Sequence, residues 1–230
     1  MVDNVQLESF SKPLDPPVRG FLHRPETEGD NGIVLTHGAG GNAQAPLLRA
    51  LAETFAGAGF TVLRCDLPYR QARSFGPPGP GDAARDRAGL KNAVAELQKS
   101  MDFPNPSSGK IFLGGHSYGG RQSSILCAEK PDLVSALLLL SYPLHPPRRP
   151  EQQRTQHLPD LRTPTLFVHG TRDPFGSIEE LQRAIRMIPA KTRLLTVEGA
   201  GHDLGFKGKG KKEELPKQIV SEFTGFFADS

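Results

Sequence analysis

Short apolar runs alternate with longer amphipathic stretches along most of this chain. Residues 33–36 and 136–141 are almost continuously apolar, which is typical of parallel strands covered on both faces of a sheet. The pattern predicts strands at residues 5–10, 18–23, 33–36, 60–64, 111–114, 136–141, 165–169 and 194–197. It predicts helices at residues 45–56, 82–100, 121–129, 178–187 and 214–227. The alternation indicates an α/β fold with a mostly parallel eight-stranded sheet, helices on both faces, and an antiparallel pair of strands at the N-terminal edge.

The segment Gly-His-Ser-Tyr-Gly, at residues 115–119, stands where one of these strands should turn sharply into a helix. Such a turn holds its serine in strained backbone geometry, and Gly115 and Gly119 remove side chains that would collide with the strand and the helix. We interpret Ser117 as a nucleophile that projects from the sheet edge. The backbone N–H of Tyr118, at the helix N-terminus, would then help to hold a negatively charged tetrahedral intermediate. Because glycines also flank serines in ordinary turns, the interpretation depends on partners elsewhere in the chain.

A serine hydroxyl is a weak nucleophile at neutral pH, so it needs a histidine base and an acid that orients the histidine. The expected chain order is serine, then Asp or Glu, then histidine. Asp173 follows the predicted strand at 165–169, and His202 lies in the glycine-rich loop after the strand at 194–197. Since the carboxyl ends of parallel strands share one edge, both side chains are expected beside Ser117. Some relatives of such a fold carry the acid after the preceding strand, but residues 143–146 hold no carboxylate, so Asp173 is preferred as the acid to Asp66, Asp132, Asp160 and Asp203.

A second glycine-rich loop, His-Gly-Ala-Gly-Gly at residues 37–41, follows another predicted strand. A loop in this place should supply the second N–H donor to the intermediate, and we expect it from Ala39. Gly38 and Gly40 would allow a substrate to approach the backbone closely, so both are candidate substrate contacts. His116 is a further candidate contact, although a structural hydrogen bond is the more frequent role of a histidine beside a buried turn.

Together these four segments resemble the α/β-hydrolase superfamily, and the resemblance extends over most of the chain. Residues 66–70, Asp-Leu-Pro-Tyr-Arg, and 115–121, Gly-His-Ser-Tyr-Gly-Gly-Arg, are more narrowly similar to a compact branch without a large cap domain. That branch contains dienelactone-hydrolase-like and testis-expressed hydrolase-like proteins. The resemblance implies the α/β-hydrolase fold and a Ser-His-Asp triad, and it does not imply a substrate. The dienelactone hydrolases proper use a cysteine where Ser117 stands, which argues against lactone opening of that kind.

Two irregular stretches lie on the presumed active edge of the sheet. Residues 67–81 are too rich in proline and glycine to be expected as a regular element, and Tyr69 and Arg70 within them are candidate substrate contacts. Residues 143–159 stand where many α/β hydrolases insert a cap domain, and they are too short and polar for a large lid, so an open site is expected. Arginines cluster in both stretches. They leave an acidic substrate open, although solvated surface loops are the more frequent explanation.

With 230 residues, the chain has the length of a single α/β-hydrolase domain, which we expect to span residues 1–230. A net charge of +3 is too small to indicate nucleic-acid binding by itself. Cys65 and Cys127 do not suggest a disulfide framework, and no metal-site spacing of histidines or cysteines is present. The glycine-rich loops match neither a phosphate-binding loop nor a dinucleotide fingerprint, so no cofactor is expected. Neither a signal peptide nor a membrane-spanning run is apparent, and the expected location is the cytoplasm.

These residues predict acyl transfer to water. His202 would take the proton of Ser117 while Asp173 orients the imidazole, and the amides of Tyr118 and Ala39 would stabilise the oxyanion. The chain is then a serine hydrolase that cleaves a small ester through an acyl-enzyme, with thioesters and peptides as other acyl substrates. Its expected partner is this small-molecule substrate. The alternative is a binding or scaffold module that keeps the fold with a vestigial triad.

Overall fold

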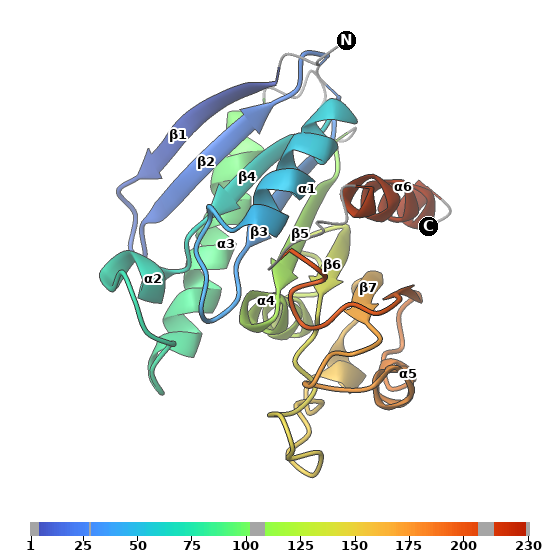
Figure 1. Cartoon of the computed structure of the whole chain (residues 1–230). Coiled ribbons are helices and arrows are strands. Elements are labelled where there is room, and N and C mark those ends of the chain that lie inside the picture. The colour runs from blue at the N-terminus through green and yellow to red at the C-terminus, as the bar shows by residue number, and fades with distance from the viewer. Residues whose placement is uncertain (1–4, 28, 102–108, 207–213, 229–230) are drawn as a thin grey trace.

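The computed structural model describes residues 5–27, 29–101, 109–206 and 214–228, which fold around one sheet of eight strands (Figure 1). The strand order is β1-β2-β4-β3-β5-β6-β7-β8. The strands are β1 (Gln6–Lys12), β2 (Val18–Arg24), β3 (Gly32–Thr36), β4 (Thr61–Cys65), β5 (Ile111–His116), β6 (Ala136–Leu140), β7 (Thr165–Gly170) and β8 (Thr192–Val197). Strand β2 pairs antiparallel with β1 and β4, and every other pairing is parallel. The predicted mostly parallel sheet, with its antiparallel edge pair, is confirmed.

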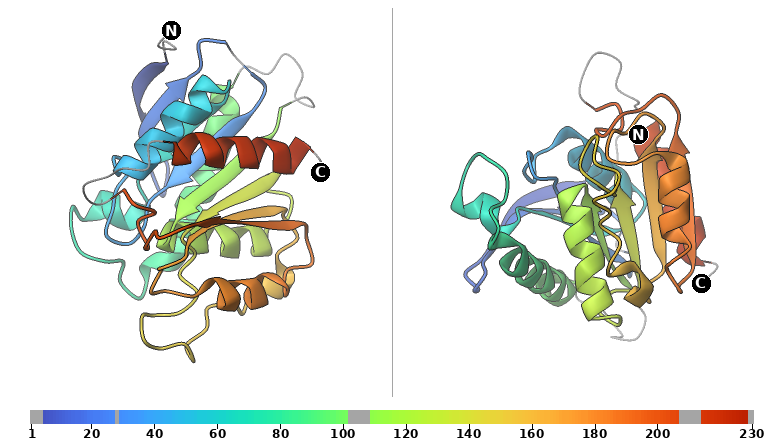
Figure 2. Two further views of the ribbon diagram at one scale, coloured as in Figure 1. Left: turned by 45° about the vertical axis from the view of Figure 1, so that its right-hand side comes forward. Right: turned by 90° about the horizontal axis from the view of Figure 1, so that it is seen from below.

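Helices cover both faces of this sheet (Figure 2). They are α1 (Pro46–Gly57), α2 (Pro68–Ala72), α3 (Asp82–Ser100), α4 (Tyr118–Glu129), α5 (Ile178–Ile185) and α6 (Leu215–Ala228). In β3, Ile33 and Leu35 pack in the layer of α1 and α6, whereas Val34 packs in the layer of α3, α4 and α5. Each such side chain stabilises the fold by about 1.5–3 kcal/mol through burial. The central strands are therefore continuously apolar in sequence because both of their faces are covered.

Helix α2 corrects the expectation that residues 67–81 form no regular element. Pro68 occupies the first position of this short helix, where the missing N–H of proline has no intrahelical partner to lose. The next free N–H, that of Tyr69, donates to the buried carboxylate of Asp86 at 3.0 Å. Pro68 therefore starts a helix, although in sequence it reads as a residue that prevents one.

No large cap covers the carboxyl edge of the sheet within the ranges that the structure describes. Residues 143–159 follow β6 as an irregular stretch that runs into one turn of 3₁₀ helix, Leu158–Asp160. His157 Nε2 lies 2.8 Å from the Ser124 hydroxyl of α4, which fixes the stretch against that helix. Among the helices of the described chain, none combines the length and the apolar character needed to cross a membrane.

Candidate active site

Ser117 lies at the sharp turn between β5 and α4. Its backbone adopts φ 52° and ψ −118°, a strained conformation for a residue that carries a side chain. A Cβ atom on Gly119 would lie 2.5 Å from the carbonyl oxygen of His37, and one on Gly115 would lie 2.5 Å from the nitrogen of Gly120. Both positions therefore require glycine. The close packing of strand, turn and helix leaves the serine side chain at the edge of the sheet.

Ser117, His202 and Asp173 form a continuous hydrogen-bonded chain. His202 Nε2 lies 2.7 Å from Ser117 Oγ, and His202 Nδ1 lies 2.8 Å from Asp173 Oδ2. Because an ionised carboxylate only accepts, Nδ1 carries the proton and Nε2 accepts the serine O–H. The three residues follow β5, β8 and β7, so the shared edge of the parallel sheet brings them together.

The Asp173 carboxylate is fully buried and is held by its own loop. Its Oδ1 accepts the backbone N–H of Phe175 at 2.9 Å, while its Oδ2 faces His202. On the inner side, His169 Nε2 lies 2.9 Å from the carbonyl oxygen of Gly176 and 3.8 Å from Asp173 Oδ2. Burial lowers the pKa of His169, so a neutral imidazole donates to Gly176 and closes the loop that carries the acid.

His202 is held by contacts from two other segments. The Phe175 ring stacks on the imidazole, with ring centroids 4.1 Å apart, and His116 Nε2 lies 2.8 Å from the His202 carbonyl oxygen. His116 also lines the cavity described below, so the structure places this predicted contact at the site. Phe175 was not predicted, and its only signal in the sequence is its position two residues after Asp173.

The loop at residues 37–41 crosses directly over the turn that carries Ser117. A Cβ atom on Gly38 would lie 3.2 Å from Ser117 Cβ, which shows how closely the two backbones approach. Tyr118 is the first residue of α4, so its N–H has no acceptor within the helix. Ala39 lines the same cavity as Ser117. The use of these two amides as oxyanion donors stays a prediction.

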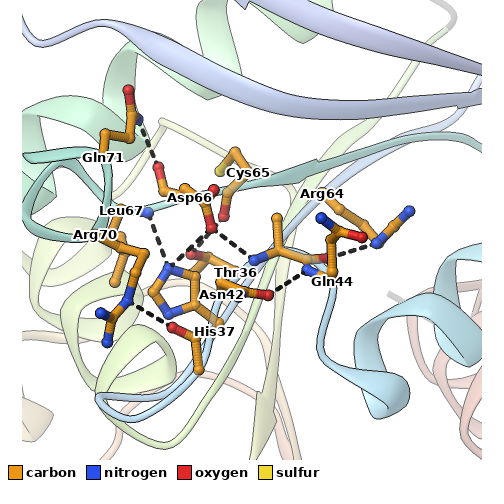
Figure 3. Close-up of polar contacts among 12 residues, drawn as sticks. Thr36, His37, Asn42, Gln44, Arg64, Cys65, Asp66, Leu67, Arg70 and Gln71 are labelled. Carbon is orange, nitrogen blue, oxygen red and sulfur yellow. Dashed lines mark hydrogen bonds and ion pairs between the residues drawn. The ribbon is translucent and has the colours of Figure 1, made fainter. Parts of the chain in front are cut away.

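The base of this loop is anchored to the end of β4 (Figure 3). His37 Nδ1 donates to the Gly38 carbonyl at 2.8 Å, and its Nε2 accepts the Leu67 N–H at 3.1 Å. Burial lowers the pKa of His37, which fits a neutral ring that donates on one side and accepts on the other. The Asp66 carboxylate accepts the N–H of Ala43 at 2.6 Å. The His37 side chain therefore acts on the loop structurally.

A cavity of about 260 Å³ lies beside Ser117. The loop at 37–41 forms one wall, with the predicted contacts Gly38 and Gly40 in it, and residues 45–48 at the start of α1 form another. The remaining lining comes from His116, Phe175, His202, Asp203 and Phe206. Residues 67–81, which include α2, and residues 143–159 contribute no lining residue.

Tyr69 and Arg70 do not line this cavity. Both are buried, with 2 % and 8 % of their surfaces exposed, and their polar side-chain atoms bond to carbonyl oxygens of the loop at 37–41. In this structure both side chains contact the loop itself, and a direct contact with substrate stays a prediction. The unpredicted helix α2 turns both side chains inward.

Neither cysteine belongs to the site. Cys65 and Cys127 are buried, and burial raises the pKa of each thiol to about 12, so both are neutral at physiological pH. Over the residues that the structure describes, no group of three or more His, Cys, Asp or Glu side chains is arranged to hold a metal ion.

Eight strands in this order, with a serine on the sharp turn after β5, are the architecture of an α/β hydrolase. A sequence profile of the alpha/beta hydrolase domain matches residues 29–227, and the chain belongs to this family.

Three proteins illustrate the similarity, each over most of its own length. The chain is 24% identical over 222 residues to the "Putative carboxymethylenebutenolidase" of Escherichia coli K12, across 83% of this chain and 79% of that protein. A dienelactone hydrolase from Anabaena variabilis superposes with a TM-score of 0.72 at 24% identity, over 96% of this chain and 98% of that one. An α/β serine hydrolase without a lid, from Xanthomonas campestris, gives 0.70 at 16% identity, over 96% and 94% of the two chains. At these identities the structural likeness shows the fold.

Proposed function

We propose that this chain is a serine hydrolase that cleaves a small ester through an acyl-enzyme, as a carboxylesterase does. The proposal rests on the hydrogen-bonded chain from Ser117 through His202 to Asp173. Membership of the α/β-hydrolase family and similarity to proteins named as hydrolases support it. A scaffold module with a vestigial triad has no use for a serine 2.7 Å from a histidine base, so these distances favour the enzyme.

In the first half of the proposed reaction, Ser117 Oγ attacks the carbonyl carbon of the ester while His202 Nε2 accepts its proton. The carbonyl π electrons move to the oxygen, which becomes the oxyanion of a tetrahedral intermediate. Asp173 stabilises the imidazolium through Nδ1–H, and the amides of Tyr118 and Ala39 donate to the oxyanion. The positive end of the α4 dipole lies at the same place and adds to this stabilisation.

The intermediate then collapses to an acyl-enzyme. The bond between the carbonyl carbon and the ester oxygen breaks, and the leaving alcohol takes the proton from His202. In the second half, His202 removes a proton from water as the water oxygen attacks the acyl carbon. Ser117 Oγ leaves with that proton and the acid is released. One water is consumed, and one alcohol and one carboxylic acid are formed.

The cavity favours a short, uncharged acyl group. Its volume of about 260 Å³ lies below the usual range of ligand pockets, about 300–1,000 Å³. Leu47, Leu48 and Phe206 give it an apolar lining, and no Lys or Arg is among its described lining residues. An acidic substrate is therefore disfavoured, because the arginine-rich stretches do not reach this cavity.

The test is labelling of the purified protein with a fluorophosphonate probe, together with hydrolysis of p-nitrophenyl esters from acetate to octanoate. We expect covalent labelling and acetate hydrolysis in the parent protein, and loss of both in Ser117→Ala. Ser221→Ala, an exposed serine on α6, serves as the matched control and should retain both. A folded parent protein that is neither labelled nor active on any ester would support the scaffold module instead.

A further inference from the structure

Two side chains of α2 bind the carbonyl oxygens of the predicted oxyanion loop. The Tyr69 hydroxyl lies 2.9 Å from the Ala39 carbonyl oxygen and 3.3 Å from that of Gly38. Arg70 donates from Nη2 to the Ala39 carbonyl at 3.1 Å and from Nε to the Gly41 carbonyl at 2.8 Å. Carbonyl groups along residues 38–41 are thus held from the side of α2.

The direction of these carbonyls sets the direction of the loop amides. A peptide unit is planar and trans, so its N–H points opposite to its C=O. A fixed Gly38 carbonyl therefore fixes the N–H of Ala39, and a fixed Ala39 carbonyl fixes the N–H of Gly40. Both residues line the cavity beside Ser117. The bonds from α2 consequently orient the amides that would face an oxyanion.

The guanidinium of Arg70 makes its hydrogen bonds to backbone carbonyls of the described chain, and it also lies over the Tyr69 ring, 5.0 Å from the ring centroid. Besides the two loop carbonyls, Nη1 donates to the Arg73 carbonyl at 3.2 Å and Nη2 to the Gly76 carbonyl at 2.9 Å. Figure 3 shows its side chain directed at the loop. Arg70 does not line the cavity. The Arg70 guanidinium therefore holds the loop, and it is not placed to bind a substrate anion in the cavity.

The same network reaches the other predicted donor. Asp86, on α3, accepts the Tyr69 N–H through Oδ1 at 3.0 Å and the Tyr118 hydroxyl through Oδ2 at 2.8 Å. The Tyr69 and Tyr118 rings also pack edge to face, with centroids 5.8 Å apart. One buried carboxylate thus connects the helix that orients Ala39 to the residue whose own amide is the second donor.

We propose that Arg70 is a positioning residue for the oxyanion hole, acting with Tyr69 through the carbonyls of the loop at 37–41. This inference rests on the proposed function, because the loop has an oxyanion to bind only if Ser117 forms tetrahedral intermediates. The ligand of the oxyanion hole is the negatively charged oxygen that forms on any acyl substrate. The role is to keep the Ala39 and Gly40 amides aimed at the position that this oxygen occupies.

Arg70→Gln tests the proposal, with Arg154→Gln as the matched control. Arg154 also donates to a backbone carbonyl, that of Pro143 at 3.2 Å, but it lies in the stretch at 143–159 and does not line the cavity. For p-nitrophenyl acetate we expect Arg70→Gln to lower kcat by about 10- to 100-fold with KM within about twofold, because misdirected donors lose contact with the transition state. Arg154→Gln should keep the parent kcat.

A trifluoromethyl ketone supplies the readout that a merely structural role would not change. The Ser117 hydroxyl adds to the carbonyl of such a ketone and forms a stable hemiketal oxyanion. The Ki of the ketone should therefore rise in Arg70→Gln by the same factor by which kcat/KM falls. Arg70→Lys should recover part of both losses, since an ammonium can still donate to one carbonyl. A folded Arg70→Gln with the parent kcat and Ki, or an equal loss in Arg154→Gln, would overturn the proposal.

If Arg70→Gln does not fold, Tyr69→Phe takes its place. This variant removes only the hydroxyl donor to the Gly38 and Ala39 carbonyls, and it should lower kcat and raise the ketone Ki by about 3- to 10-fold. Unchanged values would count against the proposal. Failure of the proposed function is distinguishable, because a parent protein that lacks Ser117-dependent labelling and turnover fails before any variant is compared.

Discussion

Phe175 stacks on the imidazole of His202, with the two ring planes inclined by 30°. The N–H of the same phenylalanine donates to Asp173, which in turn accepts from His202. One residue therefore orders the proposed acid through its backbone and the proposed base through its side chain.

Phe175→Ala should lower kcat for p-nitrophenyl acetate by about 3- to 30-fold. The backbone bond to Asp173 survives the change, but the imidazole loses the surface that holds its plane, and it then samples orientations that do not face Ser117. Steady-state kinetics and the rate of fluorophosphonate labelling check this. Phe175→Tyr, which keeps a stacking ring, should stay close to the parent, and similar losses in both variants would argue against a stacking role.

Gly119 separates the turn at Ser117 from the loop at residues 37–41. A Cβ atom there would lie 2.5 Å from the His37 carbonyl oxygen and 2.7 Å from Thr36 Cγ2. We expect Gly119→Ala to lower the free energy of unfolding by about 1–3 kcal/mol and to reduce activity, because the two segments must separate.

Gly225→Ala is the matched control for this change. A Cβ at this exposed position of α6 meets nothing within 4 Å, so the substitution should stabilise the protein by about 0.5–1 kcal/mol through helix propensity. Urea unfolding of both variants measures the difference. Equal stability of the two proteins would show that the turn at Ser117 tolerates a side chain at position 119.

The positions of the proposed triad residues follow from the sequence because each residue lies in the turn or loop after a strand. Ser117 and Asp173 come after runs that form the buried strands β5 and β7, and His202 comes after the half-exposed edge strand β8. Parallel topology then places all three at one edge. No tertiary information is needed for that step. The need for Gly115 and Gly119 can also be predicted from the sequence, since a side chain at either position would collide with backbone beside the turn.

The roles of Tyr69 and Arg70 could not be predicted in the same way. Pro68 marks a break in sequence, and in the structure it starts a helix whose next N–H, that of Tyr69, is accepted by Asp86, 17 residues later. The direction of both side chains depends on that distant carboxylate. Phe175 is a similar case, because its stacking on His202 requires a loop whose closure depends on tertiary contacts.

His23 should make the protein less stable in acid. It is buried beside Arg64, whose Nε lies 2.8 Å from His23 Nε2, and burial together with this cation lowers the His23 pKa from 6.5 to about 4. The folded state therefore binds a proton less readily than the unfolded state. The resulting stability is fully present above about pH 6.5 and is lost as the pH falls towards 4.

His23→Gln removes this titration and keeps an acceptor for Arg64. Between about pH 6.5 and 4 the free energy of unfolding should fall less in the variant than in the parent, by up to about 3 kcal/mol over the whole window. Urea unfolding at several pH values measures the slopes. Parallel curves would mean that His23 accepts a proton in the folded protein.

Leu47 should limit the length of the acyl chain. It lines the cavity from the start of α1, whereas Leu51, one turn later in the same helix, is fully buried and lies outside the lining. Leu47→Ala adds space where an acyl chain would extend, so kcat/KM for p-nitrophenyl hexanoate should rise relative to acetate by about 3- to 30-fold, the value of one or two accommodated methylenes. Leu51→Ala removes the same atoms from the core and should cost about 2–5 kcal/mol of stability without changing that ratio. An unchanged ratio in Leu47→Ala, in a protein that still hydrolyses acetate, would place the acyl chain on another side of Ser117.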